Sequence, residues 1–526
     1  MRRPPLVLLG VAVLAAACSS TDATATTTTS PRATTTTAHA TTTTTEAPEA
    51  GPWWNDRVFY EVFVRSFQDS DGNGIGDLQG VIDRLDYLND GDPATTDDLG
   101  VTGIWLMPIM ESPSYHGYDV TDYYDVDFEY GHEDDMRRLL DEAHNRGVAV
   151  IIDLVLNHTS KSHPWFGASF IGREGFEDYY LWRDDPGPHW HEAGGRYYFG
   201  LFWEGMPDLN LENAAVTAEL YAISDYWLDD IGVDGFRLDA VKHYVEEGDV
   251  LENTPSTYQW AAAFKNHVAA TRPEALTVGE VWNDTRITKT YVPDQVDLVF
   301  DFSLAEAFIE AVQQGRTGVL PIVQQQVIDS YPPGQYAAFL TNHDQDRIAS
   351  VFVGDTAKAK LAGTLLMTQP GVPFVYYGEE LGARGRKPDE RIRTPMAWTT
   401  GPGRGFTSGV PWQEFDEHAG DATVATHVRD PNSVFNHYRT LIQLRSDLEA
   451  LRTGDMTLLA TGNDAIYAFT RSAGAETIAV VLNLSNEVQQ GVQIAGLGSG
   501  TVLIGPPWEP GKAMPAQSTV ILDVSS

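Results

Sequence analysis

The sequence contains a single cysteine, Cys18, so no disulfide bond within the chain can stabilise the fold. Basic residues are also scarce: 35 Lys and Arg face 74 Asp and Glu, which gives a formal net charge of −39. A surface of this charge repels nucleic acids and anionic membrane surfaces. We therefore expect a neutral or cationic ligand and no nucleic-acid partner, with stability supplied by hydrophobic cores and bound ions.

The N-terminus has the pattern of a bacterial signal peptide, residues 1–17. Two arginines precede an apolar run at residues 6–17, which is too short to span a bilayer and suits a signal sequence. The run ends in Ala-Ala-Ala-Cys, and Cys18 stands where a lipoprotein signal would be cleaved. The leucine usual three residues before that cysteine lies one residue earlier, as Leu14, so ordinary cleavage after Ala17 stays an alternative. We expect an extracellular protein that is either a cell-surface lipoprotein, attached to the membrane only through Cys18, or secreted.

Residues 18–50 form a threonine-rich linker. Fifteen of the thirty residues from 21 to 50 are threonine, and the segment shows no apolar periodicity. It cannot bury enough surface to fold, so we expect a flexible stalk. The 526-residue chain as a whole is 42% hydrophobic and 11% aromatic, which is enough for two or three domains with their own cores. We expect a monomer.

Eight apolar segments alternate with helical patterns after residue 53. The helical periodicity is clearest at residues 78–88, 134–146, 214–230 and 435–448. Apolar strands separated by helices are typical of parallel β/α construction. Eight of them predict a (β/α)8 TIM barrel with an active site at the carboxyl ends of the strands. The predicted strands are residues 58–64, 103–108, 148–158, 235–238, 276–280, 296–300, 337–344 and 373–377.

Two regions interrupt or follow this alternation. Residues 158–208, after the third strand, are rich in tryptophan, tyrosine, glycine and histidine, and they predict an inserted domain B. Short alternating β-runs within residues 450–526 predict a C-terminal antiparallel β-sandwich. The barrel then comprises residues 51–157 and 209–449.

An acid- and glycine-rich loop follows the first strand. Residues 69–77 read Asp-Ser-Asp-Gly-Asn-Gly-Ile-Gly-Asp, with oxygen-bearing residues at alternate positions. This spacing allows a loop to wrap a hard cation, and we expect calcium. The glutamate of an EF-hand is replaced at the twelfth position by Gly80, so other ligands or water must complete the shell; a metal-free turn stays the alternative. The expected ligands are the side chains of Asp69, Asp71, Asn73 and Asp77 and the carbonyl group of Ile75.

Polar residues stand at the carboxyl ends of several predicted strands. Arg237 and Asp239 are two residues apart and share a strand face, so the guanidinium can hold the carboxylate ionised, as a nucleophile requires. One carboxylate that attacks a sugar, with another carboxyl group that protonates the leaving oxygen, fits hydrolysis of a glycosidic bond. The strand-end residues are Asp153, Asn157, His158, Arg237, Asp239, Glu280, His343 and Asp344.

These segments resemble the α-amylase superfamily of barrel glycoside hydrolases over residues 53–526. The matching motifs are Asp-Leu-Val-Leu-Asn-His at 153–158, Met-Pro-Asp-Leu-Asn at 206–210, Gly-Phe-Arg-Leu-Asp-Ala-Val-Lys-His at 235–243, Gly-Glu at 279–280 and Thr-Asn-His-Asp at 341–344. The resemblance implies a retaining enzyme with Asp239 as nucleophile, Glu280 as general acid/base and Asp344 as third carboxylate. Nearby carboxylates should raise the pKa of Glu280.

The resemblance also implies a set of substrate-binding residues. His158 and His343 would hydrogen-bond the sugar at the cleavage point, and Tyr118 would stack beneath it. Arg237 would orient the nucleophile, while Asp153 and Asn157 would be structural. Lys242 and His243 would contact the leaving side, as in endo-acting α-amylases; a solvent-exposed lysine at a helix start is the alternative for Lys242.

The motifs do not point to one branch of the superfamily. Met-Pro-Asp-Leu-Asn, the Asp-rich loop and Arg-Thr-Pro-Met-Ala-Trp at 393–398 resemble the oligo-1,6-glucosidase and neopullulanase enzymes, so the chain resembles the group between them and the α-amylases. We expect endo-acting hydrolysis of α-1,4-glucans. The alternatives are an α-glucosidase, oligo-1,6-glucosidase or neopullulanase-like enzyme, a trehalose synthase, and a non-catalytic glucan-binding protein.

Overall fold

A computed structural model describes residues 51–416, 420 and 422–525. The signal peptide, Cys18 and the threonine-rich linker lie outside these residues, so their predictions stay untested. Within the described residues, no helix has the length and hydropathy needed to cross a membrane. Eight parallel strands form the central sheet: β1 (Phe59–Val62), β2 (Gly103–Leu106), β5 (Ala149–Leu154), β9 (Gly235–Leu238), β10 (Leu276–Gly279), β11 (Leu298–Val299), β12 (Ala337–Ala338) and β13 (Val372–Tyr376).

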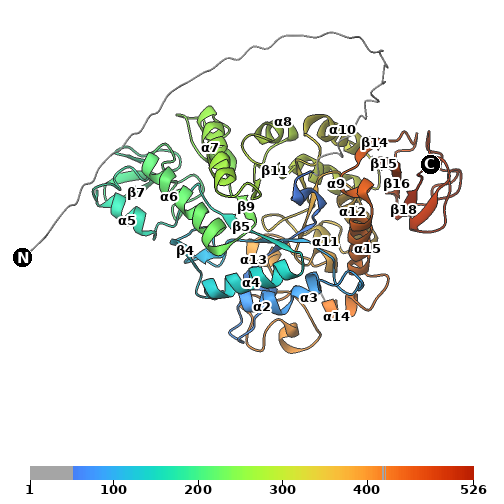
Figure 1. Cartoon of the computed structure of the whole chain (residues 1–526), viewed down its shortest axis with the longest axis horizontal. Helices are drawn as coiled ribbons and strands as arrows, with labels where there is room; N and C mark the ends of the chain where they lie inside the picture. Colours follow the sequence, from blue (N-terminus) through green and yellow to red (C-terminus); the bar gives the residue numbers. More distant parts are fainter. Residues whose placement is uncertain (1–50, 417–419, 421, 526) are drawn as a thin grey trace, which may run out of the picture. The chain divides into compact units, whose positions relative to one another are not determined.

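The eight strands close into a barrel. Their order in the sheet is β11-β10-β9-β5-β2-β1-β13-β12, and every neighbouring pair is parallel. A parallel bridge between Phe300 and Ala337 joins the two ends of this order. Strand residues are buried throughout, as parallel strands covered by helices require. The predicted (β/α)8 barrel is confirmed, with helices around the central strands (Figure 1).

The barrel interior is filled with large apolar side chains. Trp105 is 1% exposed, and its indole packs against the rings of Phe300 and Phe374, with centroids 5.5 and 6.3 Å away. The ring of Phe59 occupies the space beside Gly103, where a Cβ atom would come within 2.5 Å of it. Glycine is therefore required at position 103. This packing fills the barrel below the polar strand ends, so the chemistry is confined to one end.

The helices surround the strands with some departures from the predicted bounds. The expected helix 78–88 is two helices, because the backbone of Arg84 leaves the helical region and its guanidinium lies 4.3 Å from the Trp398 ring. The expected helix 214–230 changes after Asp225 into a π-helix, Tyr226–Ile231. The α-helices are α1 (Val64–Phe67), α2 (Leu78–Asp83), α3 (Leu85–Leu88), α4 (Glu133–Asn145), α6 (Ala214–Asp225), α7 (Pro255–Thr271), α8 (Thr285–Thr288), α9 (Phe302–Gln314), α10 (Leu320–Ser330), α11 (Ile348–Val351), α12 (Thr356–Met367), α13 (Asp389–Ile392), α14 (Val424–His427), α15 (Val434–Asp447) and α16 (Glu449–Arg452).

Two small sheets lie in the connections after β2 and β5. A hairpin of β3 (Met110–Glu111) and β4 (Asp122–Val126) carries the aromatic loop at 115–119. After β5 come a short helix and three antiparallel strands in the order β6-β8-β7. These elements are α5 (Pro164–Phe170), β6 (Trp182–Arg183), β7 (Trp190–Ala193) and β8 (Arg196–Phe199). Their aromatic residues pack on one another, as Phe166 does on Tyr198 with ring centroids 4.9 Å apart, and both residues belong to the main hydrophobic core.

The C-terminal part is antiparallel, as predicted. Five strands follow the order β14-β15-β16-β18-β17. One face packs on the main core, and the other is covered by Trp508, Met514 and neighbouring apolar residues. This confirms the C-terminal β-sandwich, which lies at one end of the folded unit in Figure 1, with α5 and β7 at the other. The strands are β14 (Asp455–Leu458), β15 (Ile466–Ala473), β16 (Glu476–Asn483), β17 (Thr501–Ile504) and β18 (Ser518–Asp523).

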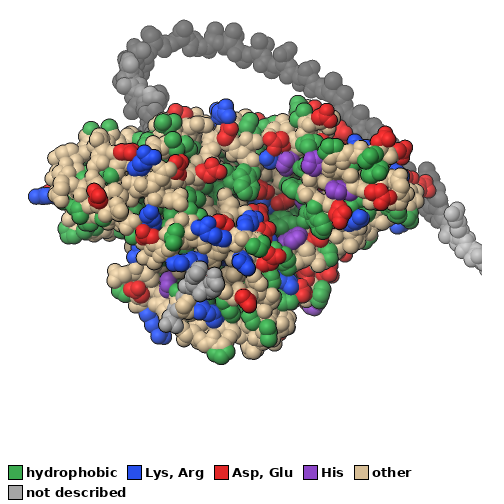
Figure 2. All heavy atoms as spheres, turned by 180° about the vertical axis from the view of Figure 1, so that it is seen from behind, with side chains coloured by type: hydrophobic (Ala, Val, Ile, Leu, Met, Phe, Trp, Pro, Cys, Tyr) green, Lys and Arg blue, Asp and Glu red, His purple; other side chains and the backbone are tan. Residues whose placement is uncertain are grey.

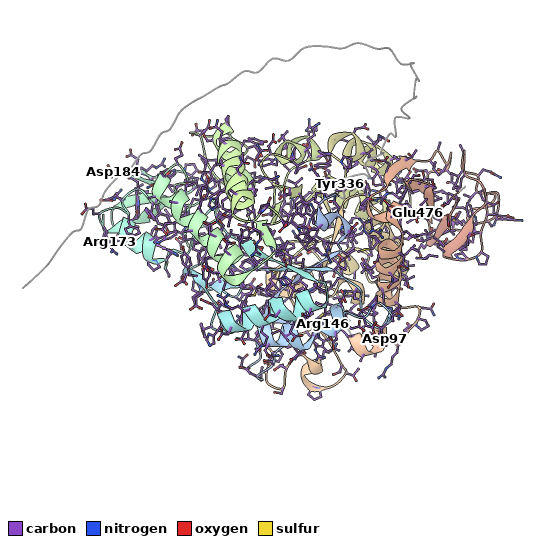
Figure 3. The ribbon with its side chains drawn as sticks, viewed as in Figure 1. Asp97, Arg146, Arg173, Asp184, Tyr336 and Glu476 are labelled. Atoms are coloured by element: carbon purple, nitrogen blue, oxygen red, sulfur yellow. The ribbon has the colours of Figure 1, made fainter. Side chains whose placement is uncertain are left out.

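Two buried arginines join the barrel to this sheet. Arg445 and Arg471 are 1% and 0% exposed. Their guanidinium groups donate to backbone carbonyls just after α12, including Gln369 at 2.6 Å and Thr368 at 2.7 Å. Burial lowers their pKa values to about 10 and about 9. Tyr336, labelled in Figure 3, packs at the same junction, and the carbonyl groups at a helix C-terminus favour such cations.

Replacing Arg471 with methionine should lower the free energy of unfolding by about 3 kcal/mol, because the buried carbonyls of Thr368 and Gly454 lose their donor. Urea unfolding followed by tryptophan fluorescence would measure it. Arg452→Met is the matched control: its guanidinium is 26% exposed and lies 3.3 Å from Asp56, so its loss should cost less than about 1 kcal/mol. Equal losses in the two variants would contradict this account.

Candidate active site

Polar side chains gather where the barrel strands end. Because the carboxyl ends of parallel strands meet at one end of a barrel, residues far apart in sequence come together there. Figure 2 shows one face of the molecule hollowed near its centre, with acidic, basic and histidine side chains around the hollow. The contributors are Glu61 of β1, Asp153 of β5, Arg237 of β9, Asp239 just after β9, Glu280 just after β10, and His343 and Asp344 after β12.

Arg237 is the central residue of this group. Its guanidinium is 1% exposed and contacts three carboxylates: Nη1 lies 2.8 Å from Asp153 and 2.6 Å from Asp239, and Nη2 lies 2.8 Å from Glu280. Burial alone would lower its pKa, but Asp153, Tyr118 and the other two acids raise it well above the usual value. Arg237 therefore stays charged and fixes the positions of both predicted catalytic carboxylates.

Backbone contacts hold Asp239 and Glu280 in adjacent positions. The amide of Glu280 donates to Leu238, the amide of Val241 donates to the carbonyl of Glu280, and Ala240 N–H donates to its carboxylate at 3.2 Å. Ala240 adopts a left-handed conformation with φ of 49°, which turns the chain sharply after Asp239. The two carboxylates thus share both a backbone link and a guanidinium.

The pKa of Glu280 is raised above its usual range, as predicted, but chiefly for a different reason. Burial is the largest cause; Arg237 opposes it, and Asp239 and Asp344 then add to the rise. The sequence interpretation attributed the shift to neighbouring carboxylates, which is the smaller effect. A buried carboxyl group retains its proton to higher pH, as a general acid must.

A second network surrounds His343, which is 0% exposed. Its Nδ1 donates to Glu61 at 2.6 Å, and its Nε2 lies 3.2 Å from Asp344 and 2.7 Å from the Tyr118 hydroxyl. Burial would lower the pKa of His343, but Asp344 and Glu61 raise it to about 10. His343 is therefore an imidazolium that donates from both ring nitrogens. Its ring also stacks on Tyr118, with centroids 5.4 Å apart.

Asp344 lies between two cations. Its Oδ1 accepts from Arg393 at 2.8 Å, and its Oδ2 faces His343. Burial raises the pKa of Asp344, but His343, Arg393 and Lys387 together hold it far below its usual range. Asp344 is therefore ionised, whereas burial favours the protonated form of Glu280. The two carboxyl groups are set for different tasks.

The loop at 115–119 and the end of β5 supply the next contacts. The Tyr118 hydroxyl donates to Asp153 at 3.0 Å, and its backbone carbonyl accepts from His158 Nε2 at 3.1 Å. Burial lowers the pKa of His158 to about 4, so this imidazole is neutral at neutral pH. Asn157 donates to Asp208 of the insertion at 3.1 Å, which ties the end of β5 to the inserted segment.

Lys242 and His243 lie on the 3-10 turn Val241–His243 that follows Asp239, beside the main cluster. Lys242 Nζ contacts Glu252 at 2.6 Å and the Trp282 carbonyl at 3.0 Å, and His243 Nδ1 lies 2.7 Å from the Leu251 carbonyl. Both side chains therefore anchor the surrounding loop, whatever substrate contacts they make. The structure places them on the Glu280 side of the site.

Sequence reasoning missed four side chains at this site. Glu61 is an acid inside the apolar run of β1, an available signal that was not used. Arg393 was noted only as part of a family motif. It does not stand at the end of a predicted strand, so the strand pattern does not place it at the site. Two exposed aromatic residues also border the cluster: Phe202, 48% exposed, packs its ring 5.2 Å from His158, and Trp282, 43% exposed, follows Glu280.

The Asp-rich loop forms a separate cluster. Carboxylate oxygens of Asp69, Asp71 and Asp77 lie within 4.8 Å of one another. Asn73 donates to Asp71 at 3.1 Å and accepts from the amide of Ile75. Asp69 is 4% exposed, and its carboxylate accepts from the amides of Gly72 and Gly74, so the loop is already folded around it. Three gathered carboxylates and an amide are a donor set that suits a hard cation.

Replacing Glu61 with glutamine should lower the pKa of His343 by about 1–2 pH units, because His343 then loses one of its two carboxylate partners. NMR titration of labelled histidine side chains would measure this. In the parent protein the stability that comes from His343 is complete below pH about 6.5 and is lost as the pH rises through about 10. Glu129→Gln, which removes a partner of Arg65 instead, is the control and should leave the His343 titration unchanged. An unchanged titration in Glu61→Gln would contradict the network.

Comparison with known proteins agrees with this architecture. A family model for the α-amylase catalytic domain matches residues 61–454. α-Amylase 3 of Dictyoglomus thermophilum is 38% identical over 446 residues, which cover 82% of this chain and 86% of that protein. Oligo-1,6-glucosidase of Parageobacillus thermoglucosidasius is 31% identical over 523 residues, covering 83% and 91%. The crystal structure of α-amylase from H. orenii has a TM-score of 0.82 at 38% identity and covers 89% of this chain and 99% of that one. The chain belongs to the α-amylase family of glycoside hydrolases.

Proposed function

We propose that this enzyme hydrolyses α-1,4-glucosidic bonds within starch and maltooligosaccharides, with net retention of configuration. One observation carries the proposal: the Arg237 guanidinium touches Asp239 with one nitrogen and Glu280 with the other, at 2.6 and 2.8 Å. It places the carboxyl group of Asp239 next to the buried carboxyl group of Glu280. This is the arrangement that a retaining glycosidase needs.

The first step breaks the glycosidic bond. A carboxylate oxygen of Asp239 attacks the anomeric carbon, and the bond from that carbon to the glycosidic oxygen breaks. Glu280 transfers its proton to the departing oxygen, and this leaves the new chain end with a hydroxyl group. Arg237 stabilises the carboxylate of Asp239 before the attack and that of Glu280 after the proton has left.

The second step releases the sugar. The Glu280 carboxylate takes a proton from water, and the resulting hydroxide attacks the anomeric carbon while the bond to Asp239 breaks. Two inversions give net retention. Asp344, held ionised by His343 and Arg393, binds hydroxyl groups of the sugar and favours the positive charge that develops on its ring. His158 carries no charge at neutral pH, because burial lowers its pKa to about 4.

Several features support a neutral glucan as substrate. The formal net charge of −39 disfavours polyanionic partners. Phe202, whose ring centroid lies 5.8 Å from that of His243, and Trp282 offer exposed aromatic surface on the Glu280 side, where units of the leaving chain would lie. The similarity to an oligo-1,6-glucosidase supports a second candidate, hydrolysis of short α-1,6-linked oligosaccharides. Product analysis distinguishes the two.

We also propose that the Asp-rich loop binds calcium, with Asp69, Asp71, Asn73 and Asp77 as side-chain ligands and the carbonyl of Ile75 as a fifth. The clustering of three carboxylates within 4.8 Å supports this. A bound cation would offset their mutual repulsion and stabilise the loop without entering the reaction. Export, with or without a lipid on Cys18, completes the proposal and rests on residues 1–50 of the sequence alone.

Replacing Asp239 with asparagine should lower kcat on soluble starch at least about a thousandfold, since an amide cannot attack the anomeric carbon. Reducing-end assays and chromatography of products from starch, maltotriose, isomaltose and maltose would test it. Mixed maltooligosaccharides from starch would support endo action, and glucose from isomaltose would support the second candidate. The control variant is Asp125→Asn, on the exposed face of β4, which should have the activity of the parent enzyme. Undiminished activity in Asp239→Asn would overturn the mechanism.

The kcat/KM of the parent enzyme should also fall at alkaline pH, because Glu280 then loses the proton that it donates. Since the pKa of Glu280 is raised, this fall should occur at a higher pH than the usual range for a carboxyl group.

Chelation of calcium should lower the thermal unfolding midpoint by about 3–6 °C relative to protein in calcium at a hundredfold excess over Kd. Differential scanning calorimetry with and without chelator measures this, and added calcium should reverse it. Asp71→Asn should abolish the calcium effect. Asp97→Asn, in another acidic loop (Figure 3), should retain it. If calcium did not change the unfolding midpoint of the parent protein, the proposed calcium site would be disproved.

A further inference from the structure

Arg393 reaches the active site from a segment outside the barrel strands, residues 384–393. Its guanidinium donates to Asp344 at 2.8 Å. The segment forms a loop whose two ends touch: the backbone of Gly385 lies so close to the Arg391 carbonyl that a Cβ atom there would collide with it. Contacts that fix both ends of this loop therefore also fix Arg393.

The turn that follows Asp344 in sequence supplies contacts to the first end of the loop. The amide of Arg347 donates to the carbonyl of Gly385 at 3.0 Å, and the amide of Gly385 donates to the hydroxyl of Ser350 at 2.8 Å. These partners stand three and six positions after Asp344. The catalytic carboxylate and the loop that carries Arg393 are therefore bonded to each other through the backbone.

The Arg347 side chain binds the second end of the loop. Its Nε donates to the Ile392 carbonyl at 2.7 Å, and its Nη1 donates to the carbonyl of Tyr377, just after β13, at 2.6 Å. The Tyr376 hydroxyl donates to the same Ile392 carbonyl at 3.1 Å. Ile392 directly precedes Arg393, so these bonds fix the backbone from which the Arg393 side chain extends.

Arg347 is 2% exposed and keeps its charge. Its guanidinium lies over the rings of Tyr376 and Tyr377, 4.5 and 4.6 Å from their centroids. Burial would lower the pKa of Arg347, but these two tyrosines and the acids Glu380 and Asp416 raise it above its usual value. A hydrogen bond from a charged donor is about twice as strong as one between neutral groups, so Arg347 holds the loop firmly.

We propose that Arg347 is the positioning residue that holds Arg393 against Asp344. Arg347 has almost no surface to offer a substrate, so it acts through the backbone of Ile392. Displacement of Arg393 would remove one of the two cations that contact Asp344, the other being His343. This inference rests on the proposed function, in which Asp344 stabilises the transition state. The loss should therefore appear in kcat.

A double-mutant cycle on soluble starch tests this in the full chain. Arg347→Met should lower kcat about tenfold and Arg393→Met about a hundredfold, because the first only displaces the cation that the second removes. The double variant should then lie within about twofold of Arg393→Met alone. Independent roles would instead multiply to a loss of about a thousandfold, and that result would overturn the inference while leaving the proposed mechanism intact.

Arg445→Met is the matched control for stability. Arg445 is also a buried arginine whose guanidinium donates to backbone carbonyls, so its loss should destabilise the fold to a similar extent. Urea unfolding of both variants would measure this. The kcat of Arg445→Met should nevertheless stay within about twofold of the parent value. If it fell as far as that of Arg347→Met, general destabilisation would explain both losses and the inference would be wrong.

A milder variant covers the case in which Arg347→Met does not fold. Tyr376→Phe removes the other donor to the Ile392 carbonyl; it should lower kcat about threefold in the parent and leave that of Arg393→Met unchanged. A loss of the same size in both backgrounds would overturn the inference. Undiminished activity in Asp344→Asn would refute the proposed role of Asp344, whatever Arg347 does.

Discussion

The site depends on one buried cation. Arg237 carries a full charge at 1% exposure, and such a charge is tolerated only when carboxylates and hydrogen bonds surround it. Asp153 lies opposite Arg237 in the register of β5 and β9, so the barrel itself supplies the first partner. Asp239 and Glu280 supply the others. The need to neutralise one guanidinium therefore brings together two carboxyl groups that would otherwise repel each other, and Trp105 and Tyr118 cover the guanidinium with their rings.

Tyr118 connects this group to a second cation, His343. Its hydroxyl contacts both Asp153 and His343, and its ring stacks on the imidazole. The Arg237 group and the His343 group are therefore one continuous polar network, in which each acid has a defined cation. A change at Glu61, far from Asp239 in sequence, would reach Asp344 through His343, which contacts both acids. Networks of this kind respond as units, so single substitutions do not partition their energy.

The sequence predicted the barrel and most of the polar strand ends because both follow from simple periodicity. Apolar strands must be buried, and residues that leave them at the carboxyl end share one surface. Strand lengths were less predictable: β11 and β12 have two residues each, since pairing depends on neighbours that the sequence does not display. Arg393 lies outside any strand, and the stacking of Tyr115 on Trp412 joins residues almost three hundred positions apart. No local pattern predicts contacts of that kind.

The strongly acidic character of the chain makes the local cations decisive. A formal charge of −39 would favour protonation of every carboxylate if its effect reached the site undiminished. Charges on the surface are screened over about 8–10 Å, whereas Arg237, Arg393 and His343 lie 2.6–3.2 Å from the carboxylates they hold. These contacts therefore affect the protonation of the carboxyl groups more strongly than the distant surface charges do. His343 and Arg393 keep Asp344 ionised, and burial favours the protonated form of Glu280, so the surface can be highly acidic without disturbing either group.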